Sequence, residues 1–396
     1  MRILVTGAVD SSAQNATTLH LFSLADFWGR AGHRVRVVVP EPSGGAIAYP
    51  IAGKPIEVVT RISAKSICKC LPNTVSALLH LPSIVRDVRR DGFDVVYVRM
   101  SILSFILVAA VRLMTNAVVV TEHNGWVPDE GRLRGHPRWA QGLEYLFQAW
   151  DGRFAHLTRA VSPQTRAKLI EAGCKADRVF VGENGTDLER MTPLNRDFAL
   201  REFGLDPKRR YIGFLGNLVY WQGMHVLIDA LAICLKNRPD WDLTIAGDGI
   251  ERESLEKQAR ARGILKRIHF LGSVPLDKAN TAVGGFDIAV APFIRERNVK
   301  TGCSPIKIRD YAGAGRVTVS SNIPAVADHS SRDWLILFEP DDVEELAHRL
   351  GELMDDDAKR EVMGGVARAF AEKHYSWDKV AAVVIGQIDA LNAGRT

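Results

Sequence analysis

Short apolar runs alternate with longer amphipathic segments along the whole chain, and this alternation constrains the fold more than any other feature. Strands buried on both faces read as continuous apolar runs, whereas the helices that cover them are amphipathic. The pattern therefore predicts parallel sheets built from βαβ units. The runs in the first half are Arg2–Thr6, Val35–Val39, Val95–Val98, Ala117–Thr121, Arg159–Val161 and Val179–Val181. Those in the second half are Tyr211–Leu215, Asp242–Ala246, Ile268–Leu271, Ile288–Ala291, Val317–Val319 and Leu335–Phe338.

The length of 396 residues is too great for one ordinary core, so we expect two domains. A stretch of mixed charge with two prolines, from Thr186 to Arg210, predicts the crossing between them. The expected fold is α/β, with Rossmann-like domains over residues 1–190 and 191–375. Apolar residues at helical spacing between Trp377 and Asn392 predict a last helix within residues 376–396.

Composition excludes several classes of protein. With 46% hydrophobic and 24% charged residues, the chain can bury two cores and is not disordered. The five cysteines include no CxxC pair, which predicts neither a zinc site nor a disulfide framework and fits a reducing compartment. We expect the spacing of Cys68 and Cys70 to be incidental. The longest apolar stretch, Ile102 to Val111, is too short to span a bilayer. The first residues resemble a buried strand and not a signal peptide. We therefore expect a cytoplasmic protein.

Positive charge is concentrated in the first half of the chain. Residues 1–190 carry 23 Lys and Arg against 17 Asp and Glu, whereas the remainder carries 28 against 29. A basic half predicts attraction to something anionic, such as a phosphorylated substrate or the headgroups at the inner face of a membrane. An unevenly charged solvated surface is an equally good interpretation. No nucleic-acid partner is expected.

Ligands of open parallel sheets bind beyond the carboxyl ends of the strands, so the residues after each run are the candidates for a site. The loop after the first run lacks the GxGxxG pattern, which argues against a dinucleotide-dependent dehydrogenase. Arg99 follows one run, and Glu122 and His123 follow another, so their side chains are expected to converge. The alternative for His123 is that it caps a helix or satisfies a buried carbonyl.

Three segments together resemble the retaining glycosyltransferases of family 4. The first joins Val161-Ser162 to Asn184-Gly185-Thr186-Asp187, and the second runs from Gly213 through Gly216 and Gly223 to Gly247-Asp248-Gly249 and Phe270-Leu271-Gly272. The third, from Ser304 to Gly315, is similar to the family's "SPxKxxEYxAxG" segment. The resemblance covers nearly the whole chain. It implies two Rossmann-like domains facing across a cleft, the GT-B arrangement, with the C-terminal helix crossing back to the first domain.

The third segment also predicts an anion site on physical grounds. Ser304 suits a helix N-cap and Pro305 the first helical position, which leaves the N–H groups of Ile306 and Lys307 without intrahelical partners. A diphosphate placed there is favoured by those donors and by the helix dipole.

The resemblance assigns roles to further residues. It implies that Asp310, in place of the usual Glu, accepts hydrogen bonds from ribose hydroxyls, that His123 contacts the transferred sugar, and that Gly272, Ser273 and Val274 lie beside the nucleobase. Gly216, Asn217 and Gln222 belong to its donor-binding glycine loop. Asn15, Arg99 and Glu122 are candidates for the acceptor side. No cofactor and no metal are expected.

The sequence departs from the family pattern at charged positions. The first Glu of the family's Glu-x7-Glu pattern falls on Gly302, and the usual Arg and Lys of the glycine loop fall on Asn217 and Gln222. Since the charge of the leaving group must be stabilised, we expect replacements among Arg295, Arg297, Lys300 and Lys307. The paired glycines that usually begin the first helix fall on Asn15 and Ala16.

The resemblance implies transfer of a sugar, with retention, from a nucleoside-diphosphate sugar, UDP-sugar favoured, to a glycan or lipid-linked acceptor. Two alternatives stay open. A sugar-nucleotide epimerase on the same fold needs further carboxylates, for which Asp10, Glu122 and Glu183 are available. A non-catalytic protein that binds nucleotide sugars or polysaccharide is suggested by the lost charges.

Overall fold

A computed structural model describes residues 1–13, 16–300, 302–327 and 333–394. The chain divides into two compact units. The first comprises Met1–Asn184, Thr301–Ser304 and Trp377–Thr396, and the second comprises Gly185–Lys300 and Pro305–Ser376. Each unit contains one parallel sheet flanked by helices, so the two predicted α/β domains are confirmed.

The first unit is built on a seven-stranded parallel sheet with the strand order β3-β2-β1-β4-β5-β6-β7. Its strands are β1 (Arg2–Gly7), β2 (Arg34–Pro40), β3 (Ile56–Arg61), β4 (Val95–Arg99), β5 (Val118–His123), β6 (Leu157–Ala160) and β7 (Val179–Val181). Every residue of β5 is buried, as expected for a central strand covered on both faces. The order reverses beside β1, which pairs with both β2 and β4.

Strand β3 was not predicted from the sequence. It is an edge strand, and most of its side chains are only partly buried. Its sequence therefore has no continuous apolar run, because none of its residues is fully buried and Glu57 and Thr60 are exposed.

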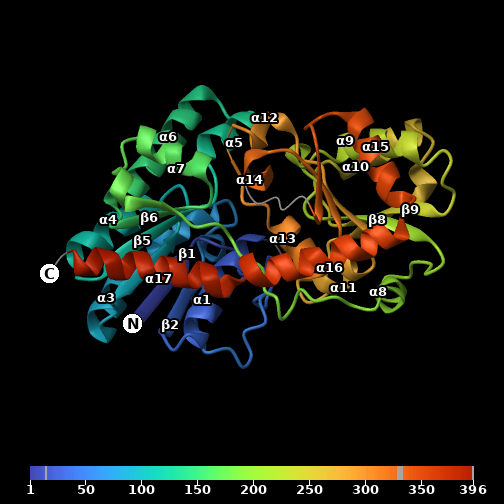
Figure 1. Ribbon diagram of the computed structural model, residues 1–396. Coiled ribbons are helices and arrows are strands. Elements are labelled where there is room, and N and C mark those ends of the chain that lie inside the picture. Colours follow the sequence, from blue (N-terminus) through green and yellow to red (C-terminus); the bar gives the residue numbers. More distant parts are fainter. Residues whose placement is uncertain (14–15, 301, 328–332, 395–396) are drawn as a thin grey trace. The chain divides into compact units, whose positions relative to one another are not determined.

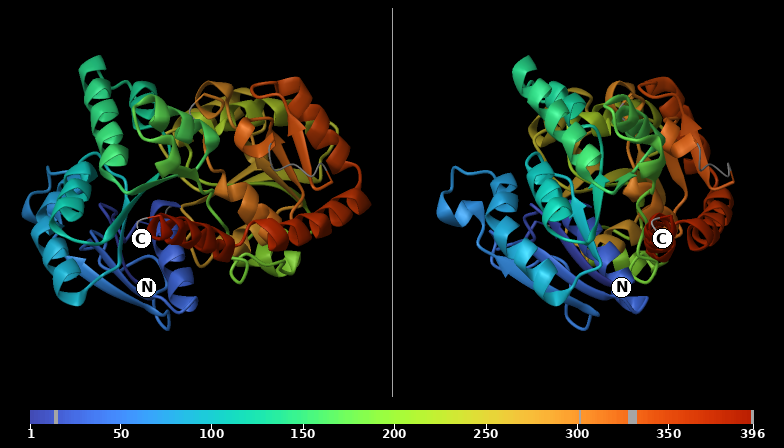
Figure 2. Two further views of the ribbon diagram at one scale, coloured as in Figure 1. Left: turned by 60° about the vertical axis from the view of Figure 1, so that its left-hand side comes forward. Right: turned by 90° about the vertical axis from the view of Figure 1, so that its left-hand side faces the viewer.

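Helices cover both faces of this sheet (Figure 1). They are α1 (Ala16–Arg30), α2 (Ala64–Ile67), α3 (Ser76–Asp91), α4 (Ser104–Met114), α5 (Val127–Leu133), α6 (Arg138–Phe154), α7 (Pro163–Glu171) and α17 (Trp377–Ala393). On one face, side chains of α3 and α4 form a core with β4 and β5. On the other face, α1 and α17 lie side by side (Figure 2).

The C-terminal helix α17 is part of the core of the first unit, as the resemblance implies. Trp377, Val384 and Ile388 are buried in the same cluster as Trp28 of α1. The Trp28 indole N–H also donates a hydrogen bond to the Ala381 carbonyl over 3.2 Å. The last helix of the sequence therefore completes the first domain.

The second unit contains a six-stranded parallel sheet with the order β10-β9-β8-β11-β12-β13. Its strands are β8 (Arg210–Leu215), β9 (Trp241–Ala246), β10 (Ile268–Gly272), β11 (Ile288–Ala291), β12 (Thr318–Ser321) and β13 (Leu335–Phe338). Its helices are α8 (Arg196–Glu202), α9 (Met224–Cys234), α10 (Arg252–Ala261), α11 (Ala279–Gly284), α12 (Arg295–Asn298), α13 (Ile306–Gly313), α14 (Pro324–Ala327), α15 (Val343–Met354) and α16 (Asp357–His374). All six predicted strands are present, with ends shifted by two residues at most.

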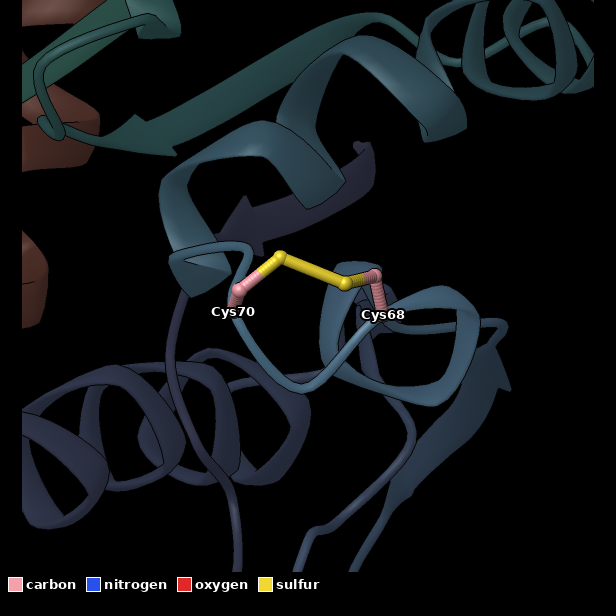
Figure 3. The surroundings of a disulfide bond; sticks show 2 residues. All are labelled: Cys68 and Cys70. Carbon is pink, nitrogen blue, oxygen red and sulfur yellow. A yellow bond between two sulfur atoms is a disulfide. The ribbon is translucent and has the colours of Figure 1, made fainter.

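A disulfide joins Cys68 and Cys70, so the expectation that their spacing is incidental was wrong (Figure 3). Both residues lie in the exposed turn after α2, with their Cα atoms 5.4 Å apart. Sequence spacing alone did not predict that this turn would bring the two thiols together.

We predict that Val384→Ala destabilises the protein by about 2 kcal/mol, because it removes two fully buried methyl groups and leaves a cavity between α17 and α1. Val383→Ala is a matched control on the same helix, since Val383 is 45% exposed. The midpoint of urea unfolding measures both variants. Equal midpoints would show that α17 does not contribute to the core.

Candidate functional site

Three predicted donor-site residues converge in the second unit around the end of β8. The Lys307 ammonium donates a hydrogen bond to Gln222 Oε1 over 2.6 Å, and its Nζ lies 3.7 Å from the centre of the Phe214 ring. A Cβ on Gly216 would stand 2.9 Å from the same Nζ. The Lys307 side chain thus turns from α13 toward the glycine loop, and brings a positive charge to the loop that lacks its usual Arg and Lys.

The other expected cations are arranged differently. Arg295 is exposed and its guanidinium forms an ion pair with Glu339 over 2.9 Å. Arg297 lies over the Trp221 ring, with its guanidinium carbon 5.5 Å from the ring centre, and Lys300 is exposed. Among these four residues, Lys307 is therefore the one that hydrogen-bonds to the glycine loop, and Arg297 lies against the Trp221 ring of the same loop.

Asp310 lies on α13 and is only partly exposed. Its Oδ1 accepts a hydrogen bond from the Thr186 hydroxyl over 2.5 Å. Burial raises the pKa of the Asp310 carboxyl to about 6, although the Thr186 hydrogen bond and the nearby Arg190 oppose this shift. A carboxyl group in this state changes its charge near neutral pH.

Asn217 and Ser273 are exposed, and Gly272 and Val274 are partly exposed. Gly272 ends β10 with φ +72°, so the chain turns sharply where the resemblance places the nucleobase. Their roles stay predictions.

Ser304 does not cap the donor helix as expected. Helix α13 begins at Ile306, its N-cap position is Pro305, and no side chain bonds to the cap. The Ser304 hydroxyl instead accepts a hydrogen bond from the Asn184 N–H over 3.1 Å. Ser162 shows the predicted pattern elsewhere: its hydroxyl accepts from the Thr165 N–H, and Pro163 is the first residue of α7.

The structure explains why a side chain is missing at position 302. Gly302 has φ +73°, and a Cβ there would stand 2.5 Å from Ser162 Oγ and 2.8 Å from Gln164 Cβ. Only glycine fits this backbone without a shift of its neighbours. The absence of the family's first Glu is therefore built into the local packing.

His123 ends β5 and has no exposed surface. Its Nε2 lies 2.8 Å from Thr121 Oγ1 and 3.1 Å from Asp151 Oδ1. Gln148 Oε1 accepts from the Val127 N–H, so the Gln148 amide nitrogen faces His123 Nδ1 at 3.1 Å and donates to it. Both ring nitrogens are thus occupied, which agrees with the alternative that His123 satisfies buried polar groups; its sugar contact stays a prediction.

Glu122, on the opposite face of β5, is the centre of a buried ionic cluster. Its carboxylate accepts from the Tyr97 hydroxyl over 2.5 Å and from Nη1 of both Arg99 and Arg159 over 2.7 Å. Burial alone would raise the pKa of Glu122, but the charges of the two arginines lower it to about 2. Arg99 and Glu122 therefore converge as predicted, although His123 points away from them. Arg159 was not predicted to take part in the site, because it begins a run that was predicted only as a strand.

Asn15, the remaining acceptor-side residue, lies outside the described residues. In the described part of the chain, no helix is both long enough and apolar enough to cross a bilayer. Peripheral contact with an anionic membrane stays a prediction.

The domains match known families. Residues 17–190 match the model described as Glycosyltransferase Family 4, and residues 209–356 match the model described as Glycosyl transferases group 1. The first half of the chain is thus similar to a glycosyltransferase family 4 domain, and the second half to a glycosyl transferases group 1 domain. The resemblance drawn from the three sequence segments is thus confirmed at this level.

The curated proteins to which this chain is similar are distant from it in sequence. D-inositol 3-phosphate glycosyltransferase of Corynebacterium urealyticum is 28% identical over 218 residues, which are 52% of this chain and 49% of that protein. Glycogen synthase of Mycobacterium tuberculosis is 25% identical over 273 residues, which are 68% of this chain and 61% of that protein. The chain thus spans about half to three fifths of the length of these curated relatives.

Solved structures share the fold over its full length. HepE of Anabaena in complex with UDP-glucose superposes with a TM-score of 0.76 at 19% identity, covering 98% of this chain and all of that chain. Sucrose-phosphate synthase of Thermosynechococcus elongatus gives a TM-score of 0.77 at 15% identity, with both chains fully covered. At these identities the likeness establishes the GT-B fold.

We predict that Gly302→Ala destabilises the protein by more than Gly53→Ala. Both glycines have φ +73°, but an added Cβ at Gly53 meets no atom within 4 Å. The conformational strain of about 1–2 kcal/mol is therefore common to both variants, and the clash with Ser162 is present only in the first. Urea unfolding gives the difference, and equal losses would contradict the close packing at position 302.

Proposed function

We propose that the protein transfers a sugar from a nucleoside-diphosphate sugar, with UDP-sugar favoured, to an acceptor hydroxyl in the synthesis of a glycan or glycolipid. Three observations support this proposal: the two glycosyltransferase domains, the names of the relatives, and the UDP-glucose complex of HepE. The observation that carries it is the position of Lys307 beside the glycine loop.

In the proposed donor site, the diphosphate binds at Lys307 and the first N–H groups of α13. Transfer breaks the bond between the anomeric carbon and the diphosphate, so negative charge develops on the departing oxygen. A fixed ammonium and backbone donors stabilise that charge without a metal ion. Gln222 accepts a hydrogen bond from Lys307 and so holds the ammonium in place.

In the same proposal, Asp310 accepts hydrogen bonds from the ribose hydroxyls. Thr186 occupies one carboxylate oxygen and orients the group. The acceptor hydroxyl attacks the anomeric carbon from the face that the diphosphate leaves, which retains configuration. Its proton passes to the departing phosphate oxygen.

The epimerase alternative is less well supported. Of the three carboxylates available for it, Glu122 is ion-paired with two arginines, and Asp10 accepts hydrogen bonds from Ser12 and Ser43. Neither carboxylate is placed to act as a base. Interconversion of two free nucleotide sugars would nevertheless identify an epimerase, and tight nucleotide binding without turnover would identify a binding protein.

Calorimetric titration with UDP, GDP, ADP and NAD, with and without magnesium, tests the donor site. We expect metal-independent binding of one nucleoside diphosphate. Lys307→Met should weaken it by roughly 10- to 100-fold, because a hydrogen bond to a charged group contributes about 1.5–3 kcal/mol. Lys236→Met, which removes an exposed lysine of the same unit, is the control. Binding of none of the diphosphates would overturn the proposal, and equal affinity of both variants would remove Lys307 from the site.

The pKa of Asp310 near 6 predicts that nucleoside binding depends on pH. The ionised carboxylate accepts ribose hydroxyls, so affinity should be full above pH 6 and fall about tenfold per unit below it. Uridine is the appropriate ligand because it has no phosphate that titrates in this range. Asp310→Asn should bind uridine weakly at every pH, and a wild-type affinity that is flat from pH 5 to 8 would contradict the assignment.

A further inference from the structure

The ionic cluster around Glu122 carries more positive than negative charge. Arg99 and Arg159 both form ion pairs with Glu122, and the side chains of the three residues are 12%, 0% and 1% exposed. Within the described part of the chain, no second carboxylate joins them. A net positive charge is therefore held at the carboxyl ends of β4 and β5, where water screens it poorly.

Arg159 cannot bind anything further. Its Nε donates to the Gly182 carbonyl, its Nη1 to Tyr97 and Glu122, and its Nη2 to the Glu183 carbonyl and Asn184 Oδ1. All five of its donors are thus directed at protein acceptors. A ligand that neutralises the excess charge would therefore have to bind the other arginine.

Arg99, in contrast, has guanidinium N–H groups that are not used within the protein. Its Nη1 donates to Glu122 Oε1, and no other acceptor among the described residues bonds to its guanidinium. The Arg99 side chain is mostly buried, but 12% of its surface is exposed and can be reached from solvent. A guanidinium edge with unused donors matches the paired oxygens of a phosphate or a carboxylate.

His20 provides a second unused polar group at the same place. It lies on α1, its side chain is 5% exposed, and neither ring nitrogen has a hydrogen-bond partner in good geometry among the described residues. Burial and the charge of Arg99 lower the pKa of His20 to about 3, although a hydrogen bond with the Asn124 side chain opposes this shift. A buried ring whose hydrogen bonds are poorly formed costs free energy, so this ring is suited to a polar ligand.

We propose that Arg99 and His20 form a subsite for an anionic group, a phosphate or a carboxylate, on the acceptor. The neutral His20 ring donates one N–H to the anion, and Arg99 supplies the charge and a two-point contact. The subsite rests on the proposed function for its assignment to the acceptor, because it lies at the carboxyl edge of the first sheet, whereas Lys307 and Asp310 belong to the second. It makes the acceptor of this enzyme an anionic molecule.

The test measures binding of inorganic phosphate by the broadening of its phosphorus-31 resonance. We expect Arg99→Gln to weaken phosphate binding by about tenfold or more, because it removes a charged hydrogen-bond pair. Arg86→Gln is the matched control: Arg86 is exposed on α3, and no ion pair involving it occurs among the described residues. Equal weakening in both variants, or in neither, would overturn the proposal.

Two competition experiments, with UDP and with acetate, test whether the subsite belongs to the acceptor and which anion it binds. Saturating UDP should leave phosphate binding at Arg99 unchanged, and displacement by UDP would assign the anion to the donor and overturn the proposal. Acetate that displaces phosphate shows that a carboxylate acceptor fits, and acetate that fails to do so restricts the acceptor to a phosphorylated molecule.

Circular dichroism and the midpoint of urea unfolding report whether the variant is folded, because UDP binding reports only on the second unit. The Arg99→Gln protein should bind UDP as the wild type does, since the residues proposed to bind the sugar donor lie in the second unit. If the wild type binds phosphate through Arg99 but binds no nucleoside diphosphate, the proposed function fails while the anion subsite stands. His20→Asn offers a milder variant and should also weaken phosphate binding, whereas unchanged binding in a folded His20→Asn protein would overturn the role of His20.

Discussion

The first domain depends on the ion pair between Glu122 and Arg159. Neither group is accessible to water, and breaking such a pair by removing one partner leaves a buried charge at a cost of about 3–5 kcal/mol. Through one guanidinium, β6 is tied to β5, to Tyr97 of β4, and to the carbonyls that follow β7. The carboxyl edge of the sheet and the segment that leaves the domain are therefore fixed together.

The two faces of β5 separate two kinds of polar chemistry at this edge. On one face Thr121 and His123 form a polar network with Gln148 and Asp151, in which every nitrogen of the His123 ring has a partner. On the other face Glu122 gathers charge, and its arginines leave an excess that a ligand can neutralise. Successive residues of one strand thus serve different purposes because the side chains of a strand alternate.

Much of the fold follows from apolar periodicity, whereas the site follows from it only in part. Runs of valine and isoleucine predict the central strands because burial on both faces demands them, and the edge strand β3 has no such run. Positions in the site depend on contacts between distant segments, which no local pattern encodes. Ser304 has the sequence of a helix cap but bonds to Asn184, and Lys307 reaches Gln222 across 85 positions of the chain. From the sequence, Gly302 looks like a position where the family's glutamate has been lost. The structure shows that a Cβ at this position would collide with Ser162.

The position of α17 has a consequence for the order in which the protein is made. Residues 1–184 leave the ribosome well before Trp377, and at ordinary synthesis rates the intervening chain takes roughly 10–40 s to appear. During that interval the apolar side of α1, including Leu21 and Trp28, has no helix beside it. The nascent first domain thus exposes an apolar surface that chaperones or other chains can bind. This surface is covered only when the seventeen-residue helix α17 has been synthesised.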